Sequence, residues 1–126
     1  MAILLFVHSL PDPCNNEVGE EILSPDNEWK AVIFERDCGA TTDFSTQISL
    51  VKGNRSLLHD SSGNIFTADS DHNKVRVNLN GLLPINVIWE NNNQLLIRYP
   101  ARARVFLQNR RYKDVRVSYA ADESLR

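Results

Sequence analysis

The sequence predicts an all-β domain, built as a small antiparallel β-sandwich or an open barrel of about eight strands with blade-like hairpins. Apolar and polar residues alternate along most of the chain, whereas no stretch keeps the 3.6-residue period of a helix. Turn-forming Gly, Pro, Asn and Asp residues separate these alternating segments at intervals of about eight to twelve residues. The chain has 126 residues, of which 42% are hydrophobic and 24% charged, as in a single globular domain.

The most strongly patterned strand is expected at residues 29–36. Apolar residues lie on both of its faces, Ile33 on one and Phe34 on the other, which indicates a central strand covered on both sides. Residues 24–27 before it have the composition of a type I turn, and the three asparagines at 91–93 separate two apolar strands as in a hairpin. The full set of expected strands is 18–23, 29–36, 45–52, 64–68, 75–79, 86–90, 94–99, 104–107 and 115–119.

Two strand–turn–strand units resemble the blades of a β-propeller. One carries Ser24-Pro25-Asp26 before the strand at Trp29, and the other carries Trp89 before Leu95-Leu96-Ile97. A closed propeller needs at least four blades of about 40 residues, so the length of the chain excludes it. The large aromatic side chains inside the strands are expected in the core; they are Trp29, Phe34, Trp89 and Phe106.

The ends of the chain set the expected domain boundaries. Residues 1–13 contain an apolar run that is shorter than the roughly 20 residues needed to cross a membrane, so we expect no transmembrane segment within this chain. This run is interpreted either as a strand or as a truncated anchor. Residues 14–119 are expected to form the all-β domain, and residues 120–126 a flexible tail.

The two cysteines, Cys14 and Cys38, are candidates for a disulfide. Two cysteines are too few for a disulfide scaffold or a typical zinc site, and the bridge would require an oxidising compartment. In the cytosol both would remain thiols, and Cys38 would then be a candidate nucleophile if the fold placed His59 or His72 beside it. The expected loop 37–44 around Cys38 contains further polar candidates, namely Asp37, Gly39, Thr41, Thr42 and Asp43.

The loop sequence also carries a resemblance to a known family. The string from Asp37 to Thr42, DCGATT, within a chain that also contains Gly63-Asn64-Ile65-Phe66 and Val87-Ile88-Trp89, resembles a family of small bacterial envelope-anchored proteins of unknown function. Members are similar in having an N-terminal anchor followed by a cysteine, which Cys14 matches. The resemblance implies a location in the bacterial envelope or periplasm, with the cytoplasm as the open alternative, and it implies no activity.

The charges are unevenly distributed along the chain. Residues 1–71 carry twelve acidic and four basic side chains, and residues 72–126 carry four acidic and ten basic ones. Arginines alternate with apolar residues in the C-terminal strands, so they are candidates for one exposed anion-binding face: Arg76, Arg98, Arg104 and Arg116. The alternative is that the two halves neutralise each other. The overall net charge of −2 makes a nucleic-acid partner the less favoured interpretation.

Motifs for metals, phosphates and cofactors are incomplete. Residues 69–73 imitate the start of a calcium loop, but Lys74 and Asn80 occupy positions where Gly and Glu are required. We therefore expect no metal, no cofactor and no catalytic residues. The sequence favours a non-enzymatic binding or interaction module with an unidentified protein partner. Anion or nucleic-acid binding and a thiol-dependent enzyme are the two alternatives.

Overall fold

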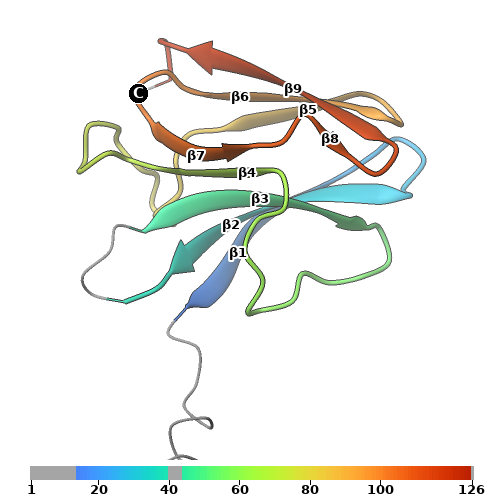
Figure 1. Cartoon of the computed structure of the whole chain (residues 1–126), viewed down its shortest axis with the longest axis horizontal. Coiled ribbons are helices and arrows are strands. Elements are labelled where there is room, and N and C mark those ends of the chain that lie inside the picture. The colour runs from blue at the N-terminus through green and yellow to red at the C-terminus, as the bar shows by residue number, and fades with distance from the viewer. Residues whose placement is uncertain (1–13, 40–43, 126) are drawn as a thin grey trace, which may run out of the picture.

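The computed structural model describes residues 14–39 and 44–125, which form nine β-strands and no helix. The strands lie in two layers that face each other (Figure 1). They are β1 (Asn15–Leu23), β2 (Trp29–Asp37), β3 (Ser45–Lys52), β4 (Phe66–Asp69), β5 (Asn86–Asn91), β6 (Gln94–Pro100), β7 (Arg104–Gln108), β8 (Arg111–Tyr112) and β9 (Val115–Asp122). The fold is a small β-sandwich of two sheets that do not close into a barrel, which confirms the predicted fold class.

The two sheets have the strand orders β1-β2-β3-β4-β7 and β5-β6-β9-β8. Every strand pair is antiparallel except β6–β9, which is parallel, so the prediction of a purely antiparallel sandwich is wrong at this pair. The physical reason is the chain path. After β6 the chain crosses to β7 in the first sheet and returns through β8, and such a crossover allows β9 to run in the same direction as β6.

Strand β2 is central and covered on both sides, as predicted. Ile33 faces the core between the sheets, whereas Phe34 is fully buried on the opposite face. Residues 53–63 lie along that outer face, where two hydrogen bonds hold them. Arg36 Nη2 donates to Asp60 O at 3.3 Å, and the backbone N of Gly63 donates to the Gln47 side chain at 2.6 Å.

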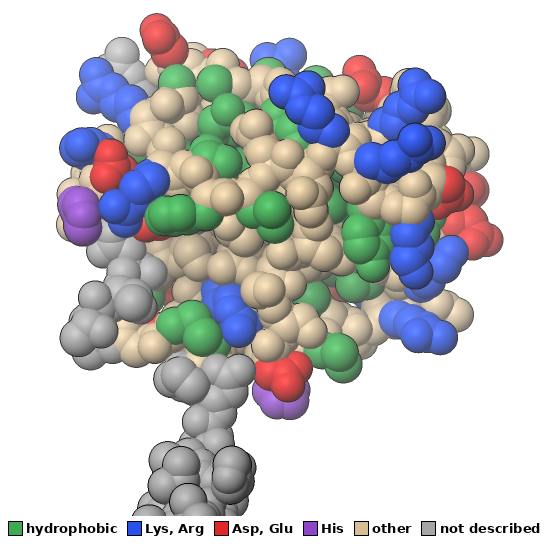
Figure 2. All heavy atoms as spheres, in the orientation of Figure 1, with side chains coloured by type: hydrophobic (Ala, Val, Ile, Leu, Met, Phe, Trp, Pro, Cys, Tyr) green, Lys and Arg blue, Asp and Glu red, His purple; other side chains and the backbone are tan. Residues whose placement is uncertain are grey.

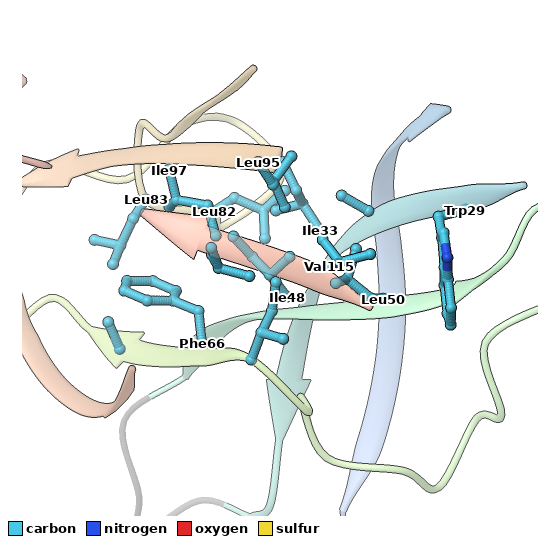
Figure 3. Close-up of a cluster of buried hydrophobic side chains, with 14 of the residues drawn as sticks. Trp29, Ile33, Ile48, Leu50, Phe66, Leu82, Leu83, Leu95, Ile97 and Val115 are labelled. Atoms are coloured by element: carbon cyan, nitrogen blue, oxygen red, sulfur yellow. The ribbon is translucent and has the colours of Figure 1, made fainter. Parts of the chain in front are cut away.

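The hydrophobic core fills the space between the sheets (Figure 3). Ile48 and Phe66 project from the first sheet toward Leu95 and Ile97 of the second, and all four side chains are fully buried. Burial of each such side chain stabilises the fold by about 1.5–3 kcal/mol.

Two aromatic side chains join the open sides of the sandwich. Trp89 of β5 donates its Nε1–H to the carbonyl of Ile22 in β1 at 2.9 Å. Tyr119 of β9 places its hydroxyl 2.8 Å from the Ile65 carbonyl and 2.6 Å from the Asn109 carbonyl, and its ring stacks on Phe66. Hydrogen bonds between the layers therefore fix how the sheets face each other.

Two core assignments need correction. Phe106 lies on the edge strand β7 and is 62% exposed, so its predicted place in the core is wrong. Its ring lies beneath the guanidinium of Arg104, with the Cζ atom 5.2 Å from the ring centroid. Trp89 is only partly buried, although it does pack against the core cluster.

The predicted strand at 75–79 is a loop. Val75 is buried, but Leu79 is fully exposed, and Asn78 organises the segment because its side-chain oxygen accepts hydrogen bonds from Asn80 N at 2.9 Å and Leu82 N at 3.0 Å. Local side-chain bonds of this kind compete with strand pairing for the same backbone groups.

The C-terminal boundary also differs from the prediction. Strand β9 continues to Asp122, paired with Pro100 of β6, so residues 120–122 belong to the sheet and not to the expected tail. The expected N-terminal segment, 1–13, lies outside the described residues.

Candidate functional site

The two cysteines form a disulfide at the open end of the β1–β2 hairpin. Asn15 pairs with Asp37 in the register of these strands, so the next residues outward, Cys14 and Cys38, also face each other. Their Cα atoms are 3.8 Å apart and their sulfurs are bonded. A disulfide sulfur is not a thiolate, so Cys38 in this form lacks the nucleophile that a thiol-dependent enzyme requires.

The loop that follows is only partly described. Asp37 accepts a hydrogen bond from Gly39 N at 3.0 Å, and Gly39 has a φ of 125°, a conformation that favours glycine. These two loop candidates therefore shape a turn beside the disulfide. The other three, Thr41, Thr42 and Asp43, lie outside the described residues.

The four candidate arginines do not share one face. Arg98 of β6 and Arg116 of β9 both point outward from the second sheet, as the alternation predicted. Arg104, however, belongs to β7 in the first sheet, and Arg76 lies in the loop that replaces the expected strand at 75–79. The predicted single face is wrong because it assumed that all four residues occupy strands of one sheet.

Arg104 instead completes an ion-pair cluster at one end of the sandwich. Its Nε and Nη2 atoms lie 3.1 and 2.6 Å from the two carboxylate oxygens of Asp69, which is buried at the end of β4. Its Nη1 atom lies 3.8 Å from Asp71. A two-point contact of this kind fixes both side chains, and it neutralises part of the acidic N-terminal half with a cation from the C-terminal half.

A left-handed turn follows β4 at this cluster. Asp71, His72 and Asn73 have φ values of 51°, 58° and 68°, and the backbone N of Lys74 donates to Ser70 O at 2.9 Å. Three consecutive non-glycine residues in this conformation cost about 1–2 kcal/mol each. The turn is held by side chains, because Ser70 Oγ accepts from Asn73 N at 3.1 Å.

The same turn fixes one cation beside a carboxylate. Lys74 Nζ lies 3.0 Å from Asp71 Oδ2, and this hydrogen bond holds the pKa of the Asp71 carboxyl below its ordinary value. The surrounding contacts therefore offset the conformational strain of this turn, which holds Lys74 in a defined position.

The turn forms one wall of a groove of about 940 Å³ at this end of the molecule. The groove is lined by Asn73–Val77, by Ala101 and Arg102 from the β6–β7 turn, and by Glu123 and Leu125 after β9. The groove is therefore lined by three cationic side chains, Lys74, Arg76 and Arg102, and by one carboxylate, that of Glu123. Within the described ranges no ion pair joins Arg76 or Arg102 to an acidic side chain.

Sequence reasoning missed this groove. In the sequence analysis Lys74 is only a mismatch to a calcium loop, and Arg102 is a basic residue near a strand end beside the four candidate arginines. Arg76 was predicted, although on a strand that does not form. A usable signal was present in Pro100 and the two small residues Ala101 and Ala103, which mark a tight turn that projects Arg102 at the end of the sheet.

Other kinds of site find little support in the described part of the chain. Residues 14–39 and 44–125 contain no group of three or more His, Cys, Asp or Glu side chains placed to bind a metal ion. The same residues include no apolar helix of the length required to span a bilayer. Comparison of the chain with family models, with curated proteins and with solved structures finds no match in any of the three.

Proposed function

We propose that this protein is a non-catalytic binding module whose groove takes an acidic, extended segment of a partner protein. The observation that carries the proposal is the convergence of Lys74, Arg76 and Arg102, from two separate turns, around one cavity. Arg76 and Arg102 are available for a ligand, since no described carboxylate forms an ion pair with either.

The chemistry of the wall favours a carboxylate-bearing peptide. Guanidinium groups bind planar oxyanions through two parallel hydrogen bonds, and each charge-assisted hydrogen bond contributes about 1.5–3 kcal/mol. The aliphatic side chains of Val77 and Leu125 lie beside these cations. A ligand that carries both an acidic and an aliphatic side chain would use both kinds of surface.

A location in an oxidising compartment of the bacterial envelope is part of this proposal. The Cys14–Cys38 disulfide supports it, because such bonds persist in the periplasm and on cell surfaces and are rare in the cytosol. The resemblance around Asp37–Thr42 points to the same compartment.

The test is a titration of isotopically labelled protein with an N-acetylated, C-amidated peptide in which a leucine lies between two glutamates. We expect shifts in the amide signals of residues 73–77 and in the side-chain Nε signals of Arg76 and Arg102. The Arg76→Ala/Arg102→Ala variant should bind at least tenfold more weakly, which corresponds to about 1.4 kcal/mol or more. Arg55→Ala/Arg110→Ala, at two exposed arginines outside the groove, removes the same charge, is the matched control and should bind normally.

Two results would contradict the proposal. One is the absence of any shift in residues 73–77 at millimolar peptide. The other is an equal loss of affinity in the Arg55/Arg110 control, which would indicate non-specific attraction between charges. Inorganic phosphate, titrated in parallel, tests the cation cluster without the aliphatic contact.

A further inference from the structure

A second cationic surface lies on the β8–β9 hairpin, at the opposite end of β9 from the groove. Figure 2 shows Lys and Arg side chains, with some Asp and Glu side chains among them, at the right-hand side of the molecule, where Figure 1 places the turn from β8 into β9 beside the β1–β2 turn. Four exposed cations fall within seven residues of this hairpin: Arg110, Arg111, Lys113 and Arg116. Asp114 is the one carboxylate in the same segment.

The hairpin holds these cations at an energetic cost. Arg111 and Arg116 are directly opposite each other in the β8–β9 pair, an arrangement that places like charges side by side. Lys113 has a φ of 54°, which is uncommon for a long side chain. No ion pair links any of the four cations to a carboxylate in the described part of the chain.

We propose that the β8–β9 hairpin docks the protein onto an anionic lipid surface. This inference is independent of the groove. A surface of negative headgroups is complementary to several adjacent cations that lack carboxylate partners, and each Lys or Arg near such a surface strengthens binding about fivefold. The proposal needs phosphate groups only, without bases or a specific sequence.

The distribution of acidic residues gives the docked protein one orientation. The β1–β2 hairpin, from Asn15 to Asp37, carries seven carboxylates and two cations. Its open end, with Glu17, Glu35 and Asp37, lies at the opposite end of β2 from Trp29, whose ring contacts Tyr112 of β8. Repulsion from the membrane would therefore turn this open end away from the lipid while the β8–β9 hairpin faces it.

A single-stranded nucleic acid fits this surface less well. Proteins that bind such strands stack the bases on exposed aromatic rings beside the cations. Here the ring of Tyr112 is already packed edge-on against Trp29, with the ring centroids 5.9 Å apart, and Lys113 Nζ lies 5.8 Å from the Tyr112 centroid. The aromatic group nearest the cations is thus engaged within the protein.

The experiment measures co-sedimentation of the whole chain with vesicles of phosphatidylglycerol and phosphatidylcholine, and with pure phosphatidylcholine vesicles. We expect binding to the anionic vesicles only, and its loss at 0.5 M salt, a concentration at which the Debye length falls to about 4 Å. Arg116→Glu changes the charge by two units and should weaken binding about 25-fold, from two factors of about five. This variant also replaces a repulsive cross-strand pair with an attractive one, so its fold should be preserved, and a thermal melt verifies that.

The matched control is Arg76→Glu, which makes the same charge change in the groove. Arg76→Glu should keep most of the binding to anionic vesicles but lose binding to the acidic peptide. Arg116→Glu should lose vesicle binding and keep binding to the peptide. Failure of one proposal is therefore distinguishable from failure of the other. Absence of binding to anionic vesicles, or an equal loss in both variants, would overturn the docking proposal. Tighter binding to an oligothymidylate than to vesicles at equal phosphate concentration would overturn it in favour of a nucleic acid.

Discussion

Reduction of the Cys14–Cys38 disulfide should lower the free energy of unfolding by about 3.5 kcal/mol. The bond joins residues 24 positions apart, so it closes a loop of about 25 residues in the unfolded chain. For that length the loop-closure entropy is about 12 cal/mol/K, or about 3.5 kcal/mol at room temperature. In the folded protein the pairing of β1 with β2 already holds the two residues together, so the bond acts mainly on the unfolded ensemble.

The assay is urea unfolding followed by tryptophan fluorescence, with and without a phosphine reductant. With an m-value of about 1.5–2 kcal/mol/M, the midpoint should fall by about 2 M. The Cys14→Ser/Cys38→Ser variant should match the reduced protein and should not respond to the reductant. If both thiols titrate and the midpoint moves by less than about 0.3 M, the loop-entropy reasoning is refuted for this hairpin.

Three further predictions concern a hydrogen bond between the sheets, a partly buried carboxyl group and the burial of two phenylalanines. Tyr119→Phe should destabilise the protein by about 1–1.5 kcal/mol in urea unfolding, because the Asn109 carbonyl loses its hydrogen-bond donor. The Ile65 carbonyl still accepts a hydrogen bond from Asn109 N. A neutral effect would show that the Tyr119 hydroxyl does not join the sheets. Burial, together with the charges of Glu17 and Asp37, raises the pKa of Glu35, so the folded state disfavours its ionised form. Glu35→Gln should therefore increase stability at pH 7, where the raised pKa makes the ionised carboxylate unfavourable in the fold, and have little effect at pH 3.5, below the ordinary value. A gain of equal size at both pH values would contradict this sign. Phe66→Ala should cost about 3–5 kcal/mol and Phe106→Ala less than about 0.5 kcal/mol, and similar losses in the two thermal melts would mean that Phe106 is not exposed.

The strands that could be predicted are those in which apolar and polar residues alternate without interruption. Residues 45–52 were predicted with the bounds that the structure shows, because the alternation is continuous and both ends are marked by polar residues. The prediction failed at 75–79, where Val75 and Val77 also alternate with polar residues. There the side chain of Asn78 captures backbone N–H groups, and alternation alone cannot reveal that competition.

The sequence alone could not predict strand pairings that depend on the three-dimensional path of the chain. The parallel β6–β9 pair and the exposure of Phe106 both follow from the crossing of the chain into the first sheet at β7. The groove is assembled in the same way, from Lys74 and Arg76 on one turn and Arg102 on another. The disulfide could be anticipated because the sequence contains two cysteines and therefore one possible pair, whereas the groove has no such signal.

The position of β9 relates the two proposed surfaces to each other. Val115 begins this strand at the cationic hairpin, and Asp122 ends it next to the groove residue Glu123. Seven residue steps of about 3.3 Å place the two ends about 23 Å apart, well beyond the Debye length of about 8 Å at physiological salt. Occupancy of one surface should therefore neither repel nor attract a charged ligand at the other. A protein docked through the hairpin would keep its groove directed away from the lipid, where an acidic segment of a second protein can reach it.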